Sequence, residues 1–291
     1  MAELHLVETV HPQDAVRDRF DALVGLDAHK QRLIEGLLLW MDQKGLETWL
    51  RSHHRHGLPL VDTIRGAAPL VLLSGEVGCG KTALATTVAT PLADELEEKV
   101  RMLESPSDIR GTGLVGELSA RVAATFTQAR AKVGKGAGLL IIDEADDLGL
   151  SRSERQAHHE DRAGLNVLIK QIDLLAREKT RLAVLMITNR ARAMDPALLR
   201  RATLTLEFTR PGPAERQLLF NRLLEGSRHS PKDVELLVQQ SEQAVPFSYS
   251  DLTLRVARAA LLESVRQDEP FGPTSLMAAL KRVEPSPLME E

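Results

Sequence analysis

Cysteine is almost absent from this chain of 291 residues, in which Cys79 is the single example. One cysteine cannot form a disulfide within the chain, so packing must stabilise the fold, and a reducing compartment is expected. Aromatic residues make up only 3% of the sequence, so the core must consist mainly of leucine, valine, isoleucine and alanine. A chain of this length can bury such a core in one large domain or in two smaller ones.

Neither sign of charge is in large excess, since the formal net charge is −4 and the isoelectric point is about 6.2. This balance argues against nucleic acid as the main partner. No apolar run approaches the ~18 residues that a membrane-spanning helix needs, and the opening MAELHLVETV lacks the basic-then-apolar pattern of a secretion signal. We therefore expect a cytoplasmic protein with no membrane partner.

Short apolar segments alternate with amphipathic ones through the first two thirds of the chain. The expected strands are 68–74, 100–105, 138–145, 182–189 and 204–208. The expected helices are 27–42, 118–133 and 163–179. Near-continuous apolar strands that alternate with helices are typical of a parallel sheet covered on both faces. The expected fold class is therefore α/β, with a parallel sheet flanked by helices.

The segment GEVGCGKT connects the first of these strands to a helical pattern. It comprises Gly75, Glu76, Val77, Gly78, Cys79, Gly80, Lys81 and Thr82. In the pattern G-x-x-x-x-G-K-[ST], backbone N–H groups surround a phosphate, the lysine reaches the terminal phosphates and the hydroxyl ligates Mg²⁺. An ordinary glycine-rich turn is the alternative, but chance produces this pattern in only about 1% of such chains. The segment predicts a P-loop that binds a nucleotide, with Cys79 as a small structural side chain.

The segment RPGPAE at 210–215 interrupts the alternation, and only helical patterns follow it, at 214–226 and 250–265. We expect a lead-in of residues 1–20, an α/β nucleotide-binding domain of residues 21–210, and a helical lid domain of residues 211–291. The histidine-rich segment RSHHRHG at 51–57 has no acidic or cysteine residue close by. A solvated loop is therefore expected there, and not a metal site.

Two acidic residues end the apolar strand at 138–145. Asp143 is expected to hold Mg²⁺ together with Thr82, and Glu144 to polarise an attacking water as a general base. Asn189 ends the next strand, and it could orient the same water if the two strands are neighbours. Each residue alone also fits ordinary turn chemistry. Downstream of a P-loop, they indicate phosphoryl transfer to water.

A short helix is expected after Asp195, which can cap it, with Pro196 at its first position. The helix would end at Arg200 and Arg201. Two arginines in the last turn can simply complement the helix dipole. A rigidly presented arginine can also complete the active site of a neighbouring subunit, and this interpretation implies a ring of identical chains.

The segments GEVGCGKT, LLIIDEAD, ITN and DPALLRRA occur in this order and together resemble the AAA+ ATPases over about residues 20–265. The resemblance implies ATP and Mg²⁺ as ligands and a homohexamer with an arginine finger in trans. It also implies an adenine-contacting segment at Val24, Gly25 and Leu26. The lid helix would begin at Ser250 and Asp251, close to the nucleotide.

Two positions depart from the pattern of that family. Thr203 stands where a second arginine is usual, and Arg201 is the candidate replacement. Ser250 and Asp251 stand where many AAA+ proteins have an arginine sensor, and Arg255 lies one turn further on.

A glycine-flanked apolar segment follows the second expected strand. Gly113, Leu114, Val115 and Gly116 resemble the pore loop of protein unfoldases, with Leu114 where an aromatic residue is common. An apolar side chain between glycines can grip a polypeptide without reading its sequence. The alternative is a loop whose glycines serve only a turn.

The run LNVLIKQIDLLAREKTRLAVLMITN and the arginine–alanine pair at 201–202 are most similar to the pachytene-checkpoint ATPases. These proteins remodel HORMA-domain proteins. The resemblance implies that Arg201 is the finger and that the N-terminal segment of a HORMA-domain protein is drawn into the pore. In bacteria it implies a role in anti-phage signalling by cyclic oligonucleotides.

Three other functions fit part of the same pattern. A helicase-loader-like ATPase acting on DNA-linked assemblies should carry basic loops, whereas this chain is slightly acidic. A general, protease-coupled unfoldase should carry a protease-docking loop or a zinc-bearing domain, and neither is evident. A scaffold that does not hydrolyse ATP is disfavoured because Lys81, Asp143, Glu144 and Asn189 are all present.

Overall fold

The computed structural model describes residues 5–54, 56–106, 116–149 and 159–288. The chain forms two compact units. The first unit contains residues 1–20, 28–74 and 82–207, and the second contains residues 21–27, 75–81 and 208–291. The P-loop up to Lys81 and the expected adenine-contacting segment therefore belong to the same unit as the C-terminal helices.

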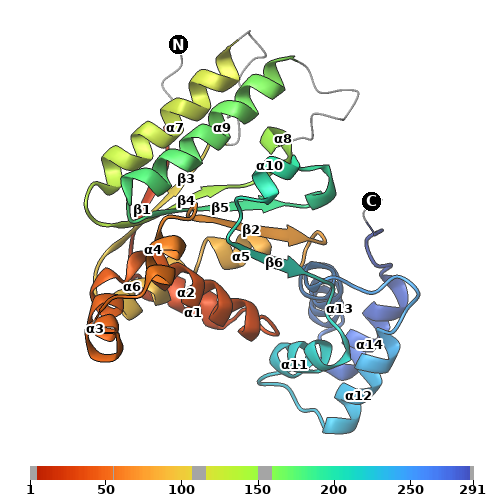
Figure 1. The fold of residues 1–291 in the computed structure, drawn as a ribbon. Helices are drawn as coiled ribbons and strands as arrows, with labels where there is room; N and C mark the ends of the chain where they lie inside the picture. The colour runs from red at the N-terminus through yellow and green to blue at the C-terminus, as the bar shows by residue number, and fades with distance from the viewer. Residues whose placement is uncertain (1–4, 55, 107–115, 150–158, 289–291) are drawn as a thin grey trace. The chain divides into compact units, whose positions relative to one another are not determined.

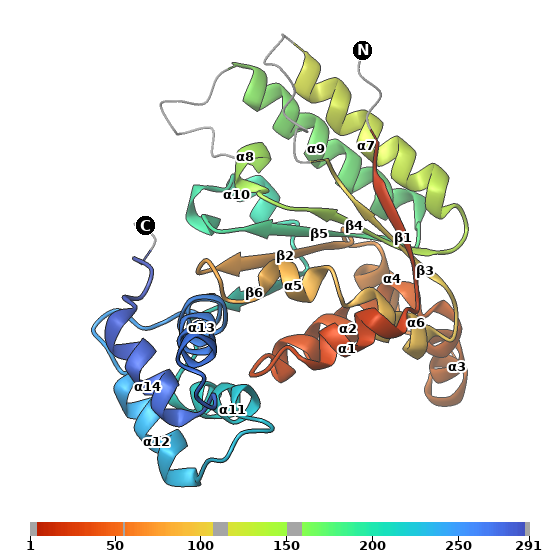
Figure 2. The same ribbon diagram turned by 180° about the vertical axis from the view of Figure 1, so that it is seen from behind.

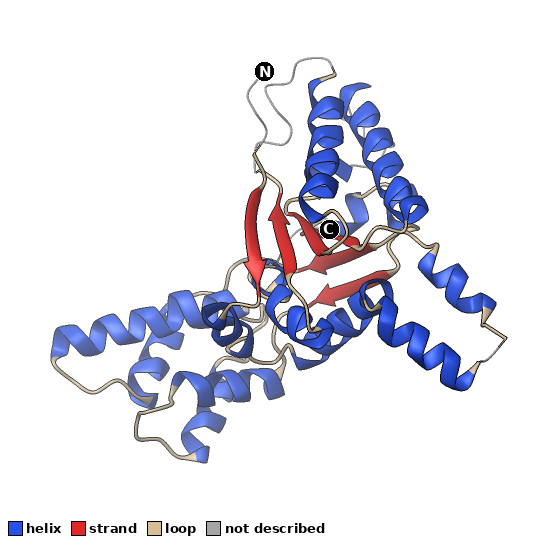
Figure 3. Cartoon of the chain, turned by 90° about the vertical axis from the view of Figure 1, so that its left-hand side faces the viewer, coloured by secondary structure: helices blue, strands red, loops and turns tan. Residues whose placement is uncertain are grey.

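The six strands among the described residues join one sheet in the order β1-β3-β4-β5-β2-β6, and strands are drawn red in Figure 3. The strands are β1 (Val7–His11), β2 (Leu70–Gly75), β3 (Val100–Glu104), β4 (Ala137–Ile142), β5 (Leu182–Thr188) and β6 (Leu204–Phe208). The pairs β3–β4, β4–β5 and β2–β5 are parallel. The predicted α/β class is confirmed, and β4 and β5 are neighbours in the sheet.

The sheet is mixed, because one edge strand runs antiparallel to its neighbour. Strand β1 pairs antiparallel with β3, and Val7 lies opposite Glu104. The expected lead-in therefore supplies an edge strand. Its sequence signal is weak because only His11 of its five residues is buried, and an edge strand that is open to solvent needs no long apolar run.

Two long helices, α7 (Glu117–Val133) and α9 (His159–Glu178), cover one face of the sheet (Figure 1). Their apolar faces join side chains of the central strands in one core. Its members include Leu118, Val122, Phe126, Leu165, Leu168, Ile172 and Leu175 from the helices and Leu70, Leu72, Leu140, Ile142, Val184 and Met186 from the strands. Burying each of these large side chains contributes roughly 1.5–3 kcal/mol, so this core holds the sheet and the two helices together.

Helices α2 (Asp27–Met41) and α6 (Ala89–Leu96) lie on the opposite face of the sheet (Figure 2). Leu33, Leu37 and Met41 recur at helical spacing and are fully buried. The shorter helical elements are α1 (Asp14–Asp21), α3 (Gln43–His53), α4 (Pro59–Arg65), α5 (Lys81–Ala85), α8 (Asp146–Gly149), η1 (Ala191–Ala193) and α10 (Pro196–Leu199).

The expected loop at 51–57 is wrong at its start, because α3 continues to His53. Trp49 contacts the two histidines at the end of this helix. Its ring stacks on His53 with 5.5 Å between centroids, and it also contacts His54 at 5.0 Å. His53 and His54 thus cover an exposed tryptophan.

The second unit is helical after β6. It contains α11 (Pro213–Leu223), α12 (Pro231–Gln240), the π-helical segment η2 (Asp251–Ala257), α13 (Arg258–Gln267) and α14 (Pro273–Arg282). Its core includes Phe220, Leu224, Leu237, Phe247, Leu252, Val256 and Leu276. Within the described part of the chain, no helix has the length and apolar character needed to cross a membrane.

Candidate active site

The P-loop leaves β2 at Gly75 and enters α5 at Lys81. Gly78 has a φ of +73°, and a Cβ at this position would lie 2.8 Å from Ser248 Oγ. Only glycine combines that backbone conformation with so close a neighbour. The Ser250 N–H donates to the Gly78 carbonyl at 3.0 Å, so the start of the lid helix lies directly against the loop.

Lys81 is buried, with 5% of its surface exposed. Its Nζ donates to the carbonyl oxygens of Gly75 at 2.7 Å and Glu76 at 2.6 Å. The ammonium group is therefore held inside the curve of the loop by backbone dipoles. A cation in this position is suited to an anionic ligand.

The expected adenine-contacting segment also lies beside the loop. Leu26 is buried, and a Cβ on Gly80 would lie 2.8 Å from Leu26 Cδ1. A Cβ on Gly25 would collide with the Tyr249 hydroxyl. Val24, Gly25 and Leu26 thus lie in the unit that contains the P-loop, as an adenine-contacting role requires.

Cys79 is 1% exposed, and its Sγ lies 3.7 Å from the Val77 carbonyl. Burial raises the pKa of its thiol to about 11. Because the thiolate is the reactive form, Cys79 is protonated and inert near neutral pH. Its geometry fits the expected structural role.

Thr82 and Asp143 meet as the sequence pattern predicts. Thr82 Oγ1 donates to Asp143 Oδ2 at 2.9 Å, and both side chains are exposed. The Glu144 N–H donates to Asp143 Oδ1 at 2.8 Å, and Glu144 has a left-handed φ of +51°. This turn directs two adjacent carboxylates out of the end of β4. A non-glycine residue held in this region is often found at functional sites.

The carboxyl ends of β4 and β5 are joined by contacts that sequence reasoning missed. The Ala145 N–H donates to the Ile187 carbonyl at 2.8 Å. Thr188 Oγ1 donates to Asp146 Oδ1 at 3.0 Å, and it accepts from the Arg190 N–H at 2.9 Å. Asn189 follows Thr188 directly and is half-buried. The only sequence signal for this support was a third acid, Asp146, shortly after Asp143 and Glu144.

Asp195 caps α10, as predicted, by accepting from the Ala197 N–H at 2.8 Å, and Pro196 is the first helical residue. The two arginines that follow have different surroundings. Arg200 is exposed. Arg201 makes a two-pronged ion pair with Asp173 of α9, in which Nε lies 2.7 Å from Oδ1 and Nη2 lies 3.0 Å from Oδ2. The hydrogen bonds to Asp173 raise the pKa of the Arg201 guanidinium.

These arginines open onto a surface pocket of about 410 Å³ in the first unit. Arg177, Arg200 and Arg201 contribute three cations to its lining, and Asp173 contributes one carboxylate. A pocket with this excess of positive charge is suited to a phosphate.

The lid position where a sensor is expected carries Asp251, which is buried. Arg255, one turn further on, donates to Asp251 Oδ1 at 2.9 Å. Arg255 is thus engaged with the acid of its own helix. The predicted substrate loop lies outside the described residues at Gly113, Leu114 and Val115. Gly116 precedes α7 as its N-cap, with a φ of +81°.

The residues present fit the ligands that the sequence predicts. Thr82 and Asp143 present a hydroxyl and a carboxylate within 2.9 Å of each other, and oxygen donors of this kind suit Mg²⁺, which also takes ligands from substrate phosphates. The glycine-rich backbone of the loop and the Lys81 ammonium are suited to bind phosphates. The assignment of individual roles remains a prediction.

Comparison with known proteins adds the family. Residues 71–210 match the family model "ATPase family associated with various cellular activities (AAA)". The chain is 38% identical over 285 residues to CD-NTase-associated protein 6 of Escherichia coli (strain MS 115-1). This match covers 94% of this chain and 90% of that protein.

Two solved structures extend the similarity. A chain of the E. coli MS115-1 HORMA:CdnC:Trip13 complex matches with a TM-score of 0.91 and 35% identity over 98% of both chains. Rhizobiales Trip13 matches with a TM-score of 0.74 and 31% identity over 97% of this chain and 98% of that one. By its motifs, its fold and its similarity to relatives over nearly its whole length, the chain belongs to the AAA ATPases.

Proposed function

We propose that this chain binds ATP with Mg²⁺ and hydrolyses it to ADP and phosphate. The P-loop and Lys81 would hold the phosphates, and Thr82 and Asp143 would hold Mg²⁺. Bound Mg²⁺ would neutralise the charge on the β- and γ-phosphates. Glu144 would take the proton of the attacking water, and Asn189 would orient that water.

The site would be completed by a second copy of the chain in a homohexameric ring. Exposed Arg200 and ion-paired Arg201 lie at the end of one capped helix, where a rigid backbone can present a guanidinium to a neighbour. Arg201 already uses its Nε and Nη2 on Asp173. We infer that Arg200 is the group free to enter the neighbouring site and that Arg201 braces the helix that carries it.

The ring would remodel a HORMA-domain protein. The observation that carries this proposal is the match over 98% of the chain, at a TM-score of 0.91, to a chain of the HORMA:CdnC:Trip13 complex. The similarity to CD-NTase-associated protein 6 supports a place beside a cyclic-oligonucleotide synthase in anti-phage signalling. We infer action in the bacterial cytoplasm, where a lone buried thiol such as Cys79 stays reduced.

Force would be applied through the loop that contains Gly113, Leu114, Val115 and Gly116. It joins β3 to α7, so movement at the end of the sheet could be passed to it along the chain. An apolar grip would let the ring pull the HORMA protein's N-terminal segment and so disassemble its complexes.

The test uses Glu144→Gln in the 291-residue chain together with a HORMA-domain protein. The amide keeps the shape of the carboxylate but cannot accept a proton, so ATP should bind normally and phosphate release should fall by roughly 10²-fold or more. Hydrolysis-deficient rings should hold the HORMA protein. We expect a stable ternary complex in gel filtration with ATP and no release of a labelled partner peptide from the closed HORMA protein.

Two controls separate the steps. Lys81→Ala should prevent both nucleotide binding and complex formation. Single-stranded and double-stranded DNA should leave the wild-type ATPase rate unchanged. Normal phosphate release by Glu144→Gln would remove Glu144 from the base role, and wild-type turnover that is stimulated by DNA but not by the HORMA protein would overturn the proposed substrate.

A further inference from the structure

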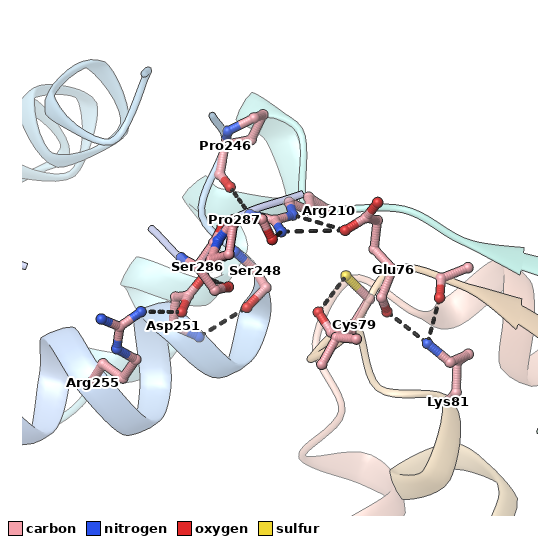
Figure 4. A network of polar contacts seen from close by, with 12 residues as sticks. Glu76, Cys79, Lys81, Arg210, Pro246, Ser248, Asp251, Arg255, Ser286 and Pro287 are labelled. Atoms are coloured by element: carbon pink, nitrogen blue, oxygen red, sulfur yellow. Dashed lines mark hydrogen bonds and ion pairs between the residues drawn. The ribbon is translucent and has the colours of Figure 1, made fainter. Parts of the chain in front are cut away.

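The segment that follows α14 returns to a buried acid at the start of the lid helix. Ser286 donates twice to Asp251 Oδ2, from its N–H at 3.1 Å and from its Oγ at 2.7 Å. The Ser248 N–H donates to the same oxygen at 3.0 Å, and Arg255 Nη1 donates to Oδ1 at 2.9 Å (Figure 4). Asp251 is 3% exposed, so these donors stabilise its charge out of contact with water.

The same segment supplies acceptors to Arg210, whose side chain is only 5% exposed. Arg210 Nη1 donates to the Ser286 carbonyl at 2.8 Å, and Nη2 donates to the Pro287 carbonyl at 2.8 Å. Arg210 Nη1 also donates to the Pro246 carbonyl. A buried guanidinium needs such partners because each unpaired donor is costly.

The remaining bonds of Arg210 lead into the P-loop. Its Nη2 and Nε contact Glu76 Oε2 at 3.2 and 3.4 Å. Glu76 is also fixed through its backbone, because its N–H donates to the Phe208 carbonyl at 2.9 Å and its carbonyl accepts from Lys81 Nζ at 2.6 Å. Figure 4 shows this chain of contacts running from Asp251 and Ser286 through Arg210 to Glu76 and Lys81.

We propose that the segment of residues 284–288 is a structural part of the phosphate site. The segment is anchored on Asp251 and positions Arg210. Arg210 contacts Glu76 and thereby fixes the conformation of the P-loop that receives the phosphates. Arg210 and Asp251 are thus positioning residues in place of a lid sensor. This inference rests on the proposed ATP binding.

The charge and burial of Arg210 and Asp251 favour a role in positioning the P-loop over a role in holding the lid together. The guanidinium of Arg210 could have been satisfied by carbonyls alone, yet it also pairs with a carboxylate from the P-loop. Hydrogen bonds from Ser286, Ser248 and Arg255 outweigh the effect of burial, which by itself would raise the pKa of Asp251, and they lower it to about 2. The anchor is therefore ionised near neutral pH.

The first experiment measures the affinity of a fluorescent ATP analogue and the thermal unfolding midpoint without nucleotide. Arg210→Gln should weaken nucleotide affinity by about tenfold or more, the effect of losing one charged hydrogen bond to the loop. Arg210→Lys keeps the positive charge and should recover part of the lost nucleotide affinity. Ser286→Asp places a second carboxylate against Asp251 and should weaken binding as well, although residue 286 lies far from the loop in sequence.

Arg222→Gln is the matched control, because Arg222 is an exposed arginine of the same unit that pairs with Glu225. It should bind nucleotide as the wild type does. At saturating ATP, Arg210→Gln should retain kcat within about twofold while its KM rises, as expected when a change affects ground-state and transition-state binding alike. A defect that only loosened the fold would lower the unfolding midpoint without this pattern.

If Arg210→Gln does not fold, Glu76→Gln replaces it. This variant breaks the same ion pair at its less buried partner. Weaker binding by Glu76→Gln and Ser286→Asp would support the proposal. Wild-type affinity in both, with only a lower unfolding midpoint, would overturn it. If the wild-type chain binds no nucleotide, or Lys81→Ala binds it normally, the proposed function itself fails.

Discussion

Two neighbouring arginines show how differently residues of one type are used at the end of α10. Arg201 is engaged in a two-pronged ion pair with Asp173, whereas Arg200 is exposed. Arg201→Ala should therefore act mainly on stability, and because this pair is about one third exposed, the free energy of unfolding should fall by only about 0.5–1 kcal/mol. Chemical denaturation measures that change.

Arg200→Ala should instead cut ATP hydrolysis by roughly 10³-fold with ATP affinity nearly unchanged, since a finger in trans acts on the transition state. Asp173→Asn is the control for Arg201→Ala, because it breaks the same ion pair but keeps the arginine. If Arg201→Ala abolishes hydrolysis while Asp173→Asn does not, Arg201 is the finger and the assignment made here from exposure is wrong.

At the scale of elements, strand β1 is held at the edge of the sheet by a buried histidine. His11 is 1% exposed, with Nδ1 2.8 Å from Thr90 Oγ1 on α6 and Nε2 3.0 Å from Thr9 Oγ1. Burial, and to a smaller extent Arg19, lower its pKa below the usual 6.5. The folded protein therefore carries His11 in its neutral form at pH values where the unfolded chain already binds a proton.

The sign of the pH dependence follows from this difference. Stability contributed by neutral His11 is present above pH 6.5 and is lost as the pH falls below it, at up to about 1.4 kcal/mol per pH unit, until the folded-state pKa is reached. His11→Asn cannot titrate, so its free energy of unfolding should fall less between pH 7 and pH 5.5. Equal slopes for both proteins would show that other groups dominate this range.

At the scale of the whole molecule, a site shared between subunits predicts complementation. In the proposed ring, Lys81→Ala chains would lack phosphate binding and Arg200→Ala chains would lack the finger. In mixed rings, an Arg200→Ala chain followed by a Lys81→Ala chain brings an intact P-loop and an intact finger together. At a 1:1 ratio, about a quarter of randomly formed interfaces are of this kind.

The mixture should therefore recover ATPase activity that neither variant has alone, as measured by phosphate release. Two affinity tags, one on each variant, verify that mixed rings form. Mixed rings without any recovered activity would argue that each site is complete within one chain.

The motifs of the P-loop and of the β4 end could be located from sequence because their geometry is local. Lys81 and Thr82 are neighbours in the chain, and Asp143 and Glu144 directly follow a buried strand, so strand periodicity and spacing are sufficient to predict them. The cap Asp195 was predictable for the same reason. Strand β1 was not, because an exposed edge strand needs little apolar pattern.

Tertiary structure alone decided which distant residues support these motifs. Arg210 lies 134 residues from Glu76, and Ser286 lies 35 residues from Asp251. Arginine, aspartate and serine usually lie on the surface of proteins, so their presence in the sequence does not mark these positions as special. Only the folded chain buries them together, and burial is what turns ordinary polar side chains into partners that must be satisfied.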